Sequence, residues 1–414
     1  PSLISRVPRP DDRDPRAVDG GWRQGRGSSR SVDSTCFGPF IAVYLTDHKW
    51  TQLDIGFALS LGSAMSMAAQ VPAGVLVDAM ASKRLAAGLA LAAICASAAL
   101  IGLSPALLPV LLAQALHGLA SCMLNPAIAA LTLGLVASSA VARRLGRNAG
   151  FAAAGAAVGA GLMGAVGSWW SSRAVLWLAA LLCLPALLML RHLRPGAAFS
   201  TAAAPPPRWP WRAVLMDRRL LIYLGCIVLF HLSNAAMLPM AAVEGPKRLG
   251  NSASLVIAAC ILVPQVIVAL LSPRVGSWAD RWGRRPVLIL GFAALPARAL
   301  LLAWADHPGM IVLAQSLDGL GAAAFGVMTP LIAADLSGRG GRFNLRMGLF
   351  GLAVGLGATL STTLAGAVAV AYTSDTAFLV LAEVGVAAVL AVALAMPETR
   401  PTLTQPAQPA TSPA

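Results

Sequence analysis

The chain has 414 residues, of which 57% are hydrophobic and only 12% are charged, and its mean hydropathy is +0.73. These values lie far outside the range of soluble globular proteins, so a soluble enzyme or binding domain is excluded and a polytopic membrane protein is predicted. The formal net charge of +14 invites a nucleic-acid role. In a membrane protein, however, the basic residues must first be placed relative to the spans.

The chain begins with a polar segment and a short apolar run. Residues 1–35 carry seven Arg and five Asp and lack the apolar core of a signal peptide, so a disordered tail is predicted. The next run, Cys36–Leu45, has ten residues, which form roughly 15 Å of helix against a hydrocarbon core of ~30 Å. We therefore predict an incomplete first helix. Because the sequence begins with Pro, we expect its true start to be missing, processed or replaced; an ordinary tail before a half-inserted segment is the alternative.

Eleven further apolar runs follow, each close to or above the ~20 residues that a spanning helix needs. They are rich in Ala, Leu and Gly and lack the period-two alternation of transmembrane β-strands, so helices are predicted. The predicted spans are 54–78, 85–103, 106–136, 148–168, 172–191, 219–241, 254–275, 287–305, 309–336, 345–371 and 375–396.

Lys and Arg residues are distributed unequally between the two sets of loops. One set holds eighteen of them, and the opposite set holds only Lys49, Arg173, Lys247 and Arg248. Since cytoplasmic loops carry the excess of basic residues, both termini are predicted to be cytoplasmic. Topology accounts for the net charge, and no nucleic-acid partner is predicted.

Cysteine usage gives no sign of a disulfide framework or a metal site. The six cysteines all fall in apolar runs, without CxxC or Cys/His spacing, which is typical of small core residues. We therefore predict no metal site, no cofactor and no enzymatic activity.

Short sequence matches recur at a nearly constant separation. The matching pairs, at separations of 202, 201 and 196, are 74–78 with 276–280, 114–120 with 315–321, and 155–161 with 351–357. Such repetition is typical of transporters built from two halves. The predicted units are a tail at 1–35, a six-helix bundle at 36–191, a Pro-rich cytoplasmic linker at 192–218, a second bundle at 219–397 and a tail at 398–414.

The stretch GSWADRWGRRP (Gly276–Pro286) places charge between two apolar runs. Gly276 and Asp280 are predicted to end one helix, the arginines to fill a short cytoplasmic loop, and Pro286 to start the next helix. The pattern Gly-x-x-x-Asp-Arg-x-Gly-Arg-Arg resembles the loop signature of the major facilitator superfamily. With the duplicated plan, the resemblance covers about residues 36–397. It implies an all-α membrane fold of twelve spans in two six-helix bundles, here with the first helix incomplete.

In that family the signature implies a conformational latch on the cytoplasmic side. The residues implied here are Gly276, Asp280, Arg281, Gly283, Arg284 and Arg285. An Asp at the C-terminal end of its own helix gains by meeting a cation or another helix's N-terminus; plain positive-inside charge is the alternative for the arginines. The first-half copy keeps Gly74, Asp78 and Lys83 but lacks the other signature positions. We therefore expect Asp280→Asn to impair transport more than Asp78→Asn.

The resemblance also implies that the first, fourth, seventh and tenth helices line a central cavity. Polar residues in these spans are candidates for a solute or proton site, because such residues are costly in lipid: they are Gln114, His117 and Asn125 on one face of the fourth helix, His231 and Asn234 on the seventh, and Gln315 and Asp318 on the tenth. Asp318 is the favoured proton carrier. Helix packing through Asn and Gln, or a buried His bonded to a carbonyl, is the alternative.

Two further charged residues, Arg298 and Glu383, lie at similar predicted depth in the ninth and twelfth helices. We predict a structural ion pair between them, with a role in coupling as the alternative. Proton-coupled drug exporters of the family commonly have an Arg where this chain has Gln114, and a Gly-Pro pair that the fifth helix here lacks. Drug/proton antiport is therefore less favoured.

The sequence thus predicts a transporter that moves a small organic solute by alternating access, driven by a solute or proton gradient. The alternative is a transport-inactive or sensing relative with a defective first helix. We expect a monomer in a bacterial cytoplasmic membrane, with a small molecule, protons and lipid as its partners.

Overall fold

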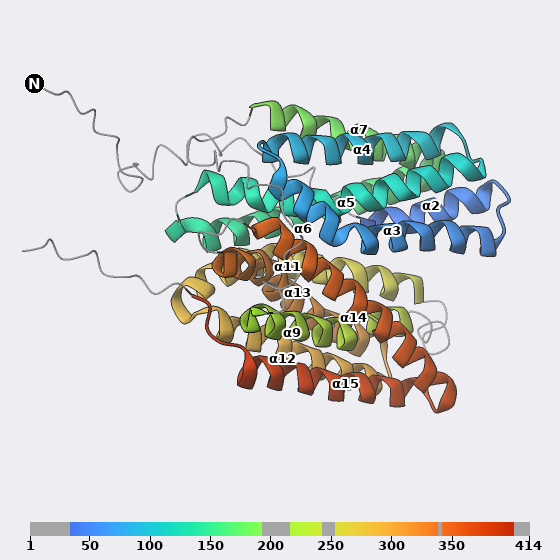
Figure 1. Cartoon of the computed structure of the whole chain (residues 1–414). Coiled ribbons are helices and arrows are strands. Elements are labelled where there is room, and N and C mark those ends of the chain that lie inside the picture. The colour runs from blue at the N-terminus through green and yellow to red at the C-terminus, as the bar shows by residue number, and fades with distance from the viewer. Residues whose placement is uncertain (1–33, 137, 193–215, 242–252, 338–341, 401–414) are drawn as a thin grey trace, which may run out of the picture.

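The computed structural model describes residues 34–136, 138–192, 216–241, 253–337 and 342–400. Within these residues the regular structure is helical throughout (Figure 1), and eleven helices are long and apolar enough to cross a membrane. The predicted all-α, multi-pass architecture is confirmed. The tail at 1–33, most of the linker (193–215) and the tail at 401–414 lie outside the described residues.

The helices form two sets of six that follow each other in the chain. The first half contains α2 (Ser34–Asp47), α3 (Gln52–Ala79), α4 (Lys83–Leu103), α5 (Leu107–Leu135), α6 (Val141–Trp169) and α7 (Ser172–His192). The second half contains α9 (Arg218–Asn234), α11 (Ala253–Trp282), α12 (Arg284–Ala303), α13 (Pro308–Ser337), α14 (Phe343–Ala371) and α15 (Ser374–Leu390), which continues into a π-helical turn, η6 (Ala391–Ala395).

Most predicted span limits agree with the helices to within a few residues; α9, predicted to reach residue 241, ends at Asn234, and the other exceptions lie at the Arg-rich end. α6 begins at Val141 rather than 148, and α11 continues to Trp282 rather than 275. The apolar pattern marks where a helix leaves the hydrocarbon, but the backbone stays helical beyond that point. α2 has 14 residues, about 21 Å of helix, and is not one of the eleven candidate spans.

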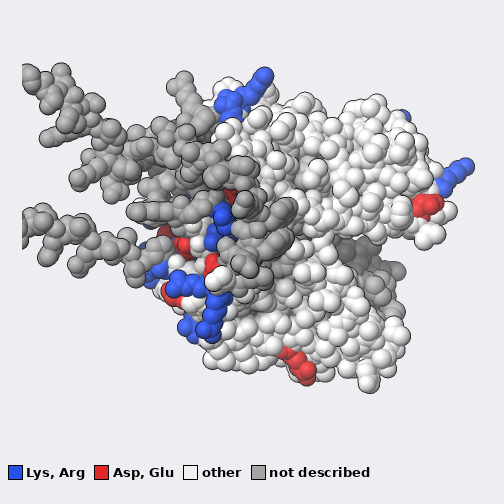
Figure 2. All heavy atoms as spheres, viewed as in Figure 1, with Lys and Arg blue, Asp and Glu red and all other residues white. Residues whose placement is uncertain are grey.

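Charge is confined largely to one end of the molecule. Figure 2 shows Lys and Arg side chains gathered at the end where α3 meets α4, with a broad belt of uncharged surface between this end and the opposite one. The positive-inside rule assigns the Arg-rich end to the cytoplasm.

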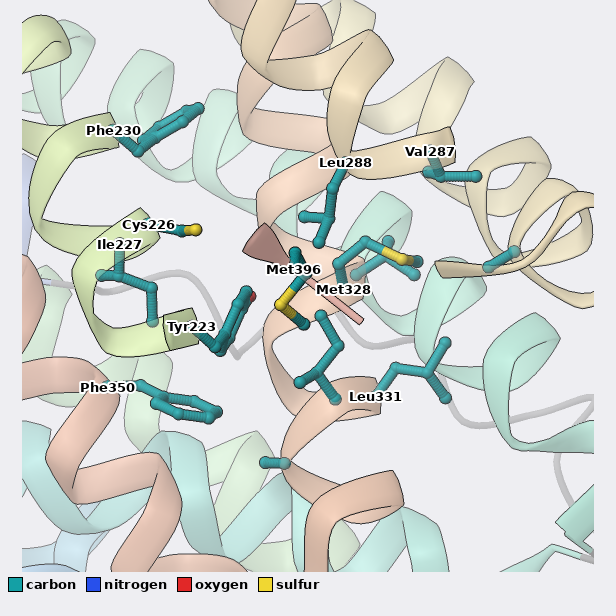
Figure 3. Packing of buried hydrophobic residues seen from close by; sticks show 14 of the residues in the cluster. Tyr223, Cys226, Ile227, Phe230, Val287, Leu288, Met328, Leu331, Phe350 and Met396 are labelled. Carbon is teal, nitrogen blue, oxygen red and sulfur yellow. The ribbon is translucent and has the colours of Figure 1, made fainter. Parts of the chain in front are cut away.

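Among the described residues, the hydrophobic core joins the two halves at the cytoplasmic end. One large cluster combines second-half residues such as Tyr223, Phe350 and Met328 (Figure 3) with Val71 of α3 and Ala142 of α6. At the outer end each half has a separate cluster: one lies within α2 to α7, and the other within the second half. Within the described part of the chain, the halves therefore share a core at the cytoplasmic end, and no such cluster joins them at the outer end.

Candidate functional site

The first latch, formed by Gly74 and Asp78 at the end of α3, docks on the start of α14. The Asp78 carboxylate accepts hydrogen bonds from the Asn344 backbone N–H (3.0 Å), the Asn344 side-chain amide (2.7 Å) and the Leu345 N–H (2.8 Å). A carboxylate in this place satisfies N–H groups that a helix start leaves unpaired and faces the positive end of its dipole. A Cβ at Gly74 would lie 2.2 Å from the Asn344 carbonyl oxygen, so only glycine permits this approach.

The second latch, Gly276 and Asp280 at the end of α11, docks on the start of α6. A Cβ at Gly276 would lie 2.3 Å from the Ala142 carbonyl oxygen, which reproduces the close approach of the first latch. Asp280 differs from Asp78 in its partner, because its carboxylate lies 3.6 Å from Arg284 Nη1 of its own half. Asp78 therefore makes more polar contacts with the other half than Asp280 does, although Asp280→Asn was expected to impair transport more than Asp78→Asn.

The predicted cytoplasmic loop in the signature is reduced to one residue. α11 continues through Arg281 to Trp282, Gly283 alone breaks the helix with φ of +97°, and α12 begins at Arg284 rather than at Pro286. Arg281 is exposed. The remaining signature arginines therefore belong to the first turn of α12.

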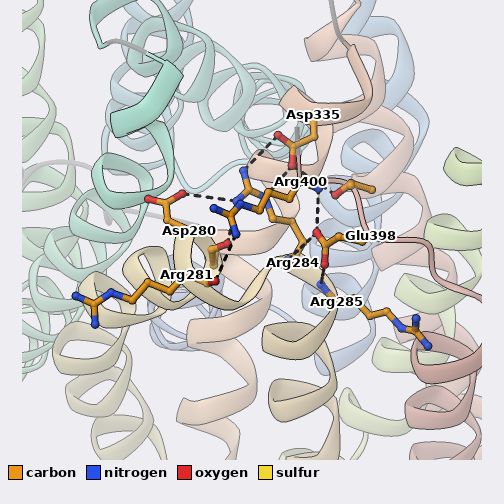
Figure 4. A network of polar contacts seen from close by, with 9 residues as sticks. Asp280, Arg281, Arg284, Arg285, Asp335, Glu398 and Arg400 are labelled. Atoms are coloured by element: carbon orange, nitrogen blue, oxygen red, sulfur yellow. Dashed lines mark hydrogen bonds and ion pairs between the residues drawn. The ribbon is translucent and has the colours of Figure 1, made fainter. Parts of the chain in front are cut away.

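Arg284 ties together three helix ends of its own half (Figure 4). Its guanidinium donates to Asp335 on α13 through Nε (2.8 Å) and Nη2 (3.4 Å), and to the Ala279 carbonyl through Nη1 (2.9 Å). The Arg284 and Asp335 side chains are each 7% exposed. This buried, two-pronged ion pair links α11, α12 and α13.

Glu398, predicted to begin the C-terminal tail, caps the start of α12. Its carboxylate accepts from the backbone N–H groups of Arg284 (2.8 Å), Arg285 (3.1 Å) and Arg400 (2.9 Å). Partial burial pushes the pKa of Glu398 upward, but these N–H groups and the Arg284 charge outweigh it and hold the pKa below its ordinary value. A Cβ at Gly283 would lie 2.5 Å from Glu398 Oε2, so glycine is required here for space as well as for backbone conformation.

In the first half, a lysine binds the carbonyl groups at the end of α3, as Arg284 binds the Ala279 carbonyl in the second half. Lys83 Nζ donates to the carbonyls of Val77 (2.7 Å), Asp78 (3.0 Å) and Met80 (2.8 Å) at the end of α3. Val77 and Ala279 are related by the repeat separation of 202, so the same carbonyl is satisfied in both halves by different cations.

A polar cluster lies inside the second half, where α9, α12 and α13 meet. Arg298 donates to Asp318 (2.6 Å) and Asn234 through Nη1 and to Gln315 (2.7 Å) through Nη2. Arg298 is 2% exposed and the Asp318 side chain is 24% exposed. The predicted pairing of Arg298 with Glu383 is wrong, because Glu383 is exposed on α15 and Asp318 takes its place.

His231 lies on α9 but outside this cluster. Its ring packs edge-on against Phe325 with centroids 4.9 Å apart, and its Nε2 is buried without a hydrogen-bond partner among the described residues. After Asn234 the α9 backbone is interrupted, and the Ala236 N–H released there donates to the Ser361 hydroxyl of α14 (3.0 Å). His231 therefore faces aromatic packing, whereas Asn234 joins the polar cluster.

A cavity of about 810 Å³ lies between α2, α3, α5 and α14, on the boundary of the two halves. Gln114 and His117 of α5 line the cavity, as predicted, and Gln70 of α3 and Thr359 of α14 line it too. No Asp, Glu, Lys or Arg is among the described residues that line it. Asn125 is exposed and is not one of the lining residues.

The repeat relates this cavity wall to the charged cluster. Gln114 and His117 correspond to Gln315 and Asp318 at a separation of 201, and the same separation relates Ser97 to Arg298. Ser97 Oγ lies 3.5 Å from His117 Nδ1, as Arg298 lies against Asp318. Ser97 was missed from the sequence, and Arg298 was paired with Glu383 instead; the constant separation is the signal that relates these two positions to each other.

No group of three or more His, Cys, Asp or Glu side chains is arranged to hold a metal ion within the part of the chain that the structure describes.

Comparisons with known proteins agree on one family. The family model described as Major Facilitator Superfamily matches residues 28–276 and 248–413. An uncharacterized MFS-type transporter of Mycobacterium tuberculosis (strain ATCC 25618 / H37Rv) is 35% identical over 372 residues, covering 87% of this chain and 89% of the relative. Multidrug resistance protein MdtH of Yersinia pestis (strain Pestoides F) is 32% identical over 111 residues, 27% of this chain and 25% of that protein.

Two solved structures show the same fold. The E. coli fucose:proton symporter FucP has a TM-score of 0.69 at 15% identity, covering 87% of this chain and 96% of the other. The human organic anion transporter MFSD10 has a TM-score of 0.63 at 17% identity, covering 91% of both.

Proposed function

Because this chain belongs to the major facilitator superfamily, we propose that it moves a small organic solute across the membrane by alternating access and couples this movement to protons. The solute site is the cavity between α2, α3, α5 and α14. The coupling site is the Arg298–Asp318 pair.

The position of the cavity supports the transport step. It lies on the boundary between the halves, and in alternating access this boundary opens on one side while it closes on the other. Both latches bring the halves together at the cytoplasmic end, whereas the outer ends have separate cores. This arrangement corresponds to an outward-facing state.

The chemistry of the lining favours an uncharged solute that carries hydrogen-bonding groups. The polar side chains at the cavity are amides, hydroxyls and an imidazole, such as Gln70, Gln114, Thr359 and His117. A charged solute held there would lose its hydration without gaining an opposite charge from the lining.

The Arg298–Asp318 pair supports the coupling step and is the observation on which it depends. Asp318 is the more exposed member of a buried ion pair, and we infer that it is the member that takes up the proton. Protonation would remove the negative charge and leave Arg298 buried against the neutral Asn234 and Gln315. Because an unpaired buried charge is strongly unfavourable, the packing of α9, α12 and α13 would have to rearrange.

Vesicle transport assays with and without an imposed pH gradient test this function. We expect Asp318→Asn to abolish pH-driven uptake or efflux while exchange of solute across the membrane continues. Asp306→Asn is the matched control, because Asp306 is an exposed acid between α12 and α13. Transport that stays pH-driven in Asp318→Asn would contradict the coupling role, and a wild type that moves no solute would favour a transport-inactive or sensing relative.

We further propose a bacterial cytoplasmic membrane as its location, because one relative is mycobacterial. We also propose that the protein acts as a monomer.

A further inference from the structure

A groove of about 830 Å³ runs between α4 and α7 on the outer surface of the first half. Six leucines line it, among them Leu85, Leu89, Leu184 and Leu188, and these four are exposed. α4 and α7 lie side by side along the edge of the molecule (Figure 1). The groove is separate from the solute cavity and from both latches.

One end of the groove is basic. Arg84 in the first turn of α4 and Arg191 in the last turn of α7 line it there. Both lie at the end of the molecule where α3 meets α4, which places this end of the groove at the cytoplasmic membrane surface. A wholly apolar groove would show only a preference for hydrocarbon, whereas this one also presents two positive charges.

The apolar part of the groove fits within one leaflet. The helices are antiparallel, and the groove extends along α4 from Arg84 to Leu89 and along α7 from Arg191 back to Leu184. At 1.5 Å per residue this is about 10 Å, against about 15 Å for half of the hydrocarbon core. The leucines therefore meet acyl chains while the arginines meet headgroups.

Small residues create the groove. α4 packs against the rest of the half through the buried Ala86, Ala87 and Ala90, which keep the helices close, and the leucines stand on either side. Gly88 also lines the groove, and a Cβ built there meets no atom within 4 Å. Glycine is unfavourable inside a helix, and no close contact with the protein accounts for it here.

We propose that this groove binds an anionic phospholipid of the cytoplasmic leaflet. One acyl chain lies along Gly88 between the leucines, and the phosphate lies between Arg84 and Arg191. Charge complementarity favours this occupant, because basic side chains at the cytoplasmic surface attract anionic headgroups and the apolar walls bury the chain.

Native mass spectrometry of the full chain, titrated with phosphatidylglycerol or with zwitterionic phosphatidylethanolamine, tests the proposal. We expect the double variant Arg84→Gln, Arg191→Gln to lower the affinity for phosphatidylglycerol by about 30-fold and to leave phosphatidylethanolamine binding nearly unchanged. Gly88→Trp should weaken binding of both lipids, and its matched control, Gly88→Ala, should not. Arg274→Gln, an exposed arginine of the second half that donates to the Leu270 carbonyl, is the control for general charge loss.

Unchanged phosphatidylglycerol affinity in the double variant, or in Gly88→Trp, would overturn the proposal. A dimer that Gly88→Trp dissociates and that lipid does not affect would overturn it too, because the groove would then hold a second copy of the chain. If the double variant fails to fold, the salt dependence of the wild type decides. Affinity for phosphatidylglycerol that falls with ionic strength supports the role of the arginines, and affinity independent of salt contradicts it.

Discussion

The two latches look unequal in the sequence and are unequal in the structure, but in opposite ways. The second copy keeps every signature position, yet its Asp280 lies 3.6 Å from Arg284 of the same half. The first copy has lost the signature arginines, yet Asp78 receives three hydrogen bonds from the start of α14. The glycines, Gly74 and Gly276, permit the same close approach in both.

This difference separates two tasks within one sequence motif. The glycine and the aspartate bring the halves together, and for that task the first copy is complete. The signature arginine Arg284 instead binds Asp335, the Ala279 carbonyl and, through its backbone, Glu398, all within the second half. Loss of arginines from the first copy therefore need not weaken the contact between halves.

The largest effect is expected from removing the arginine that holds the second half together. Arg284→Ala leaves Asp335 buried without its cation and should cost about 3–5 kcal/mol of unfolding free energy. Arg281→Ala, at an exposed signature position, should change stability by less than about 0.5 kcal/mol. Denaturant unfolding of both variants in detergent measures this. Equal effects would remove the distinction between the two arginines.

A smaller effect, similar for both latches, is expected from blocking the close approach. Gly74→Leu and Gly276→Leu each force a side chain into facing backbone and should cost the closed cytoplasmic state about 1–3 kcal/mol. Spin labels at His192→Cys and Met216→Cys, one in each half, would report a longer distance. Gly56→Leu is the control on α3, because a Cβ there meets nothing within 4 Å. A distance unchanged in the latch variants would show that the glycines do not set the approach.

The smallest effect concerns the cap on α12. Because the folded pKa of Glu398 lies below its ordinary value of about 4.5, its stabilisation is complete above that value and is lost as the pH falls through the lowered pKa. Glu398 as a residue is largely exposed, so the contribution should be no more than about 1 kcal/mol. Thermal unfolding of the wild type and Glu398→Gln should differ at neutral pH and converge in acid. A constant difference would contradict the charged cap.

Hydrophobicity and repetition predicted the fold because both are properties of the sequence itself. Eleven apolar runs became eleven spanning helices, and the separation of 201 related Gln114 to Gln315. The pairing of Arg298 was predicted wrongly because depth along a helix does not give the direction in which a side chain points. Arg298 and Glu383 were placed at similar depth, but only Arg298 faces the interior.

The role of Glu398 could not be read from its position just beyond the last span. It depends on Gly283 turning the backbone with a positive φ and on the chain returning to the start of α12, a contact between residues 114 apart. Likewise, the sequence does not reveal that α14 begins within reach of Asp78. Contacts of this kind are properties of the packed structure.

The first latch, despite its reduced motif, carries the stronger polar contact between the halves. Hydrogen exchange of the amides at the start of α14 tests it most directly, because the Asn344 and Leu345 N–H groups donate to Asp78. Asp78→Asn should accelerate their exchange about 10- to 100-fold, in line with ~1.5–3 kcal/mol for hydrogen bonds to a charged group. Asp280→Asn should leave them unchanged. Equal protection in wild type and Asp78→Asn, or faster exchange in Asp280→Asn, would contradict the account.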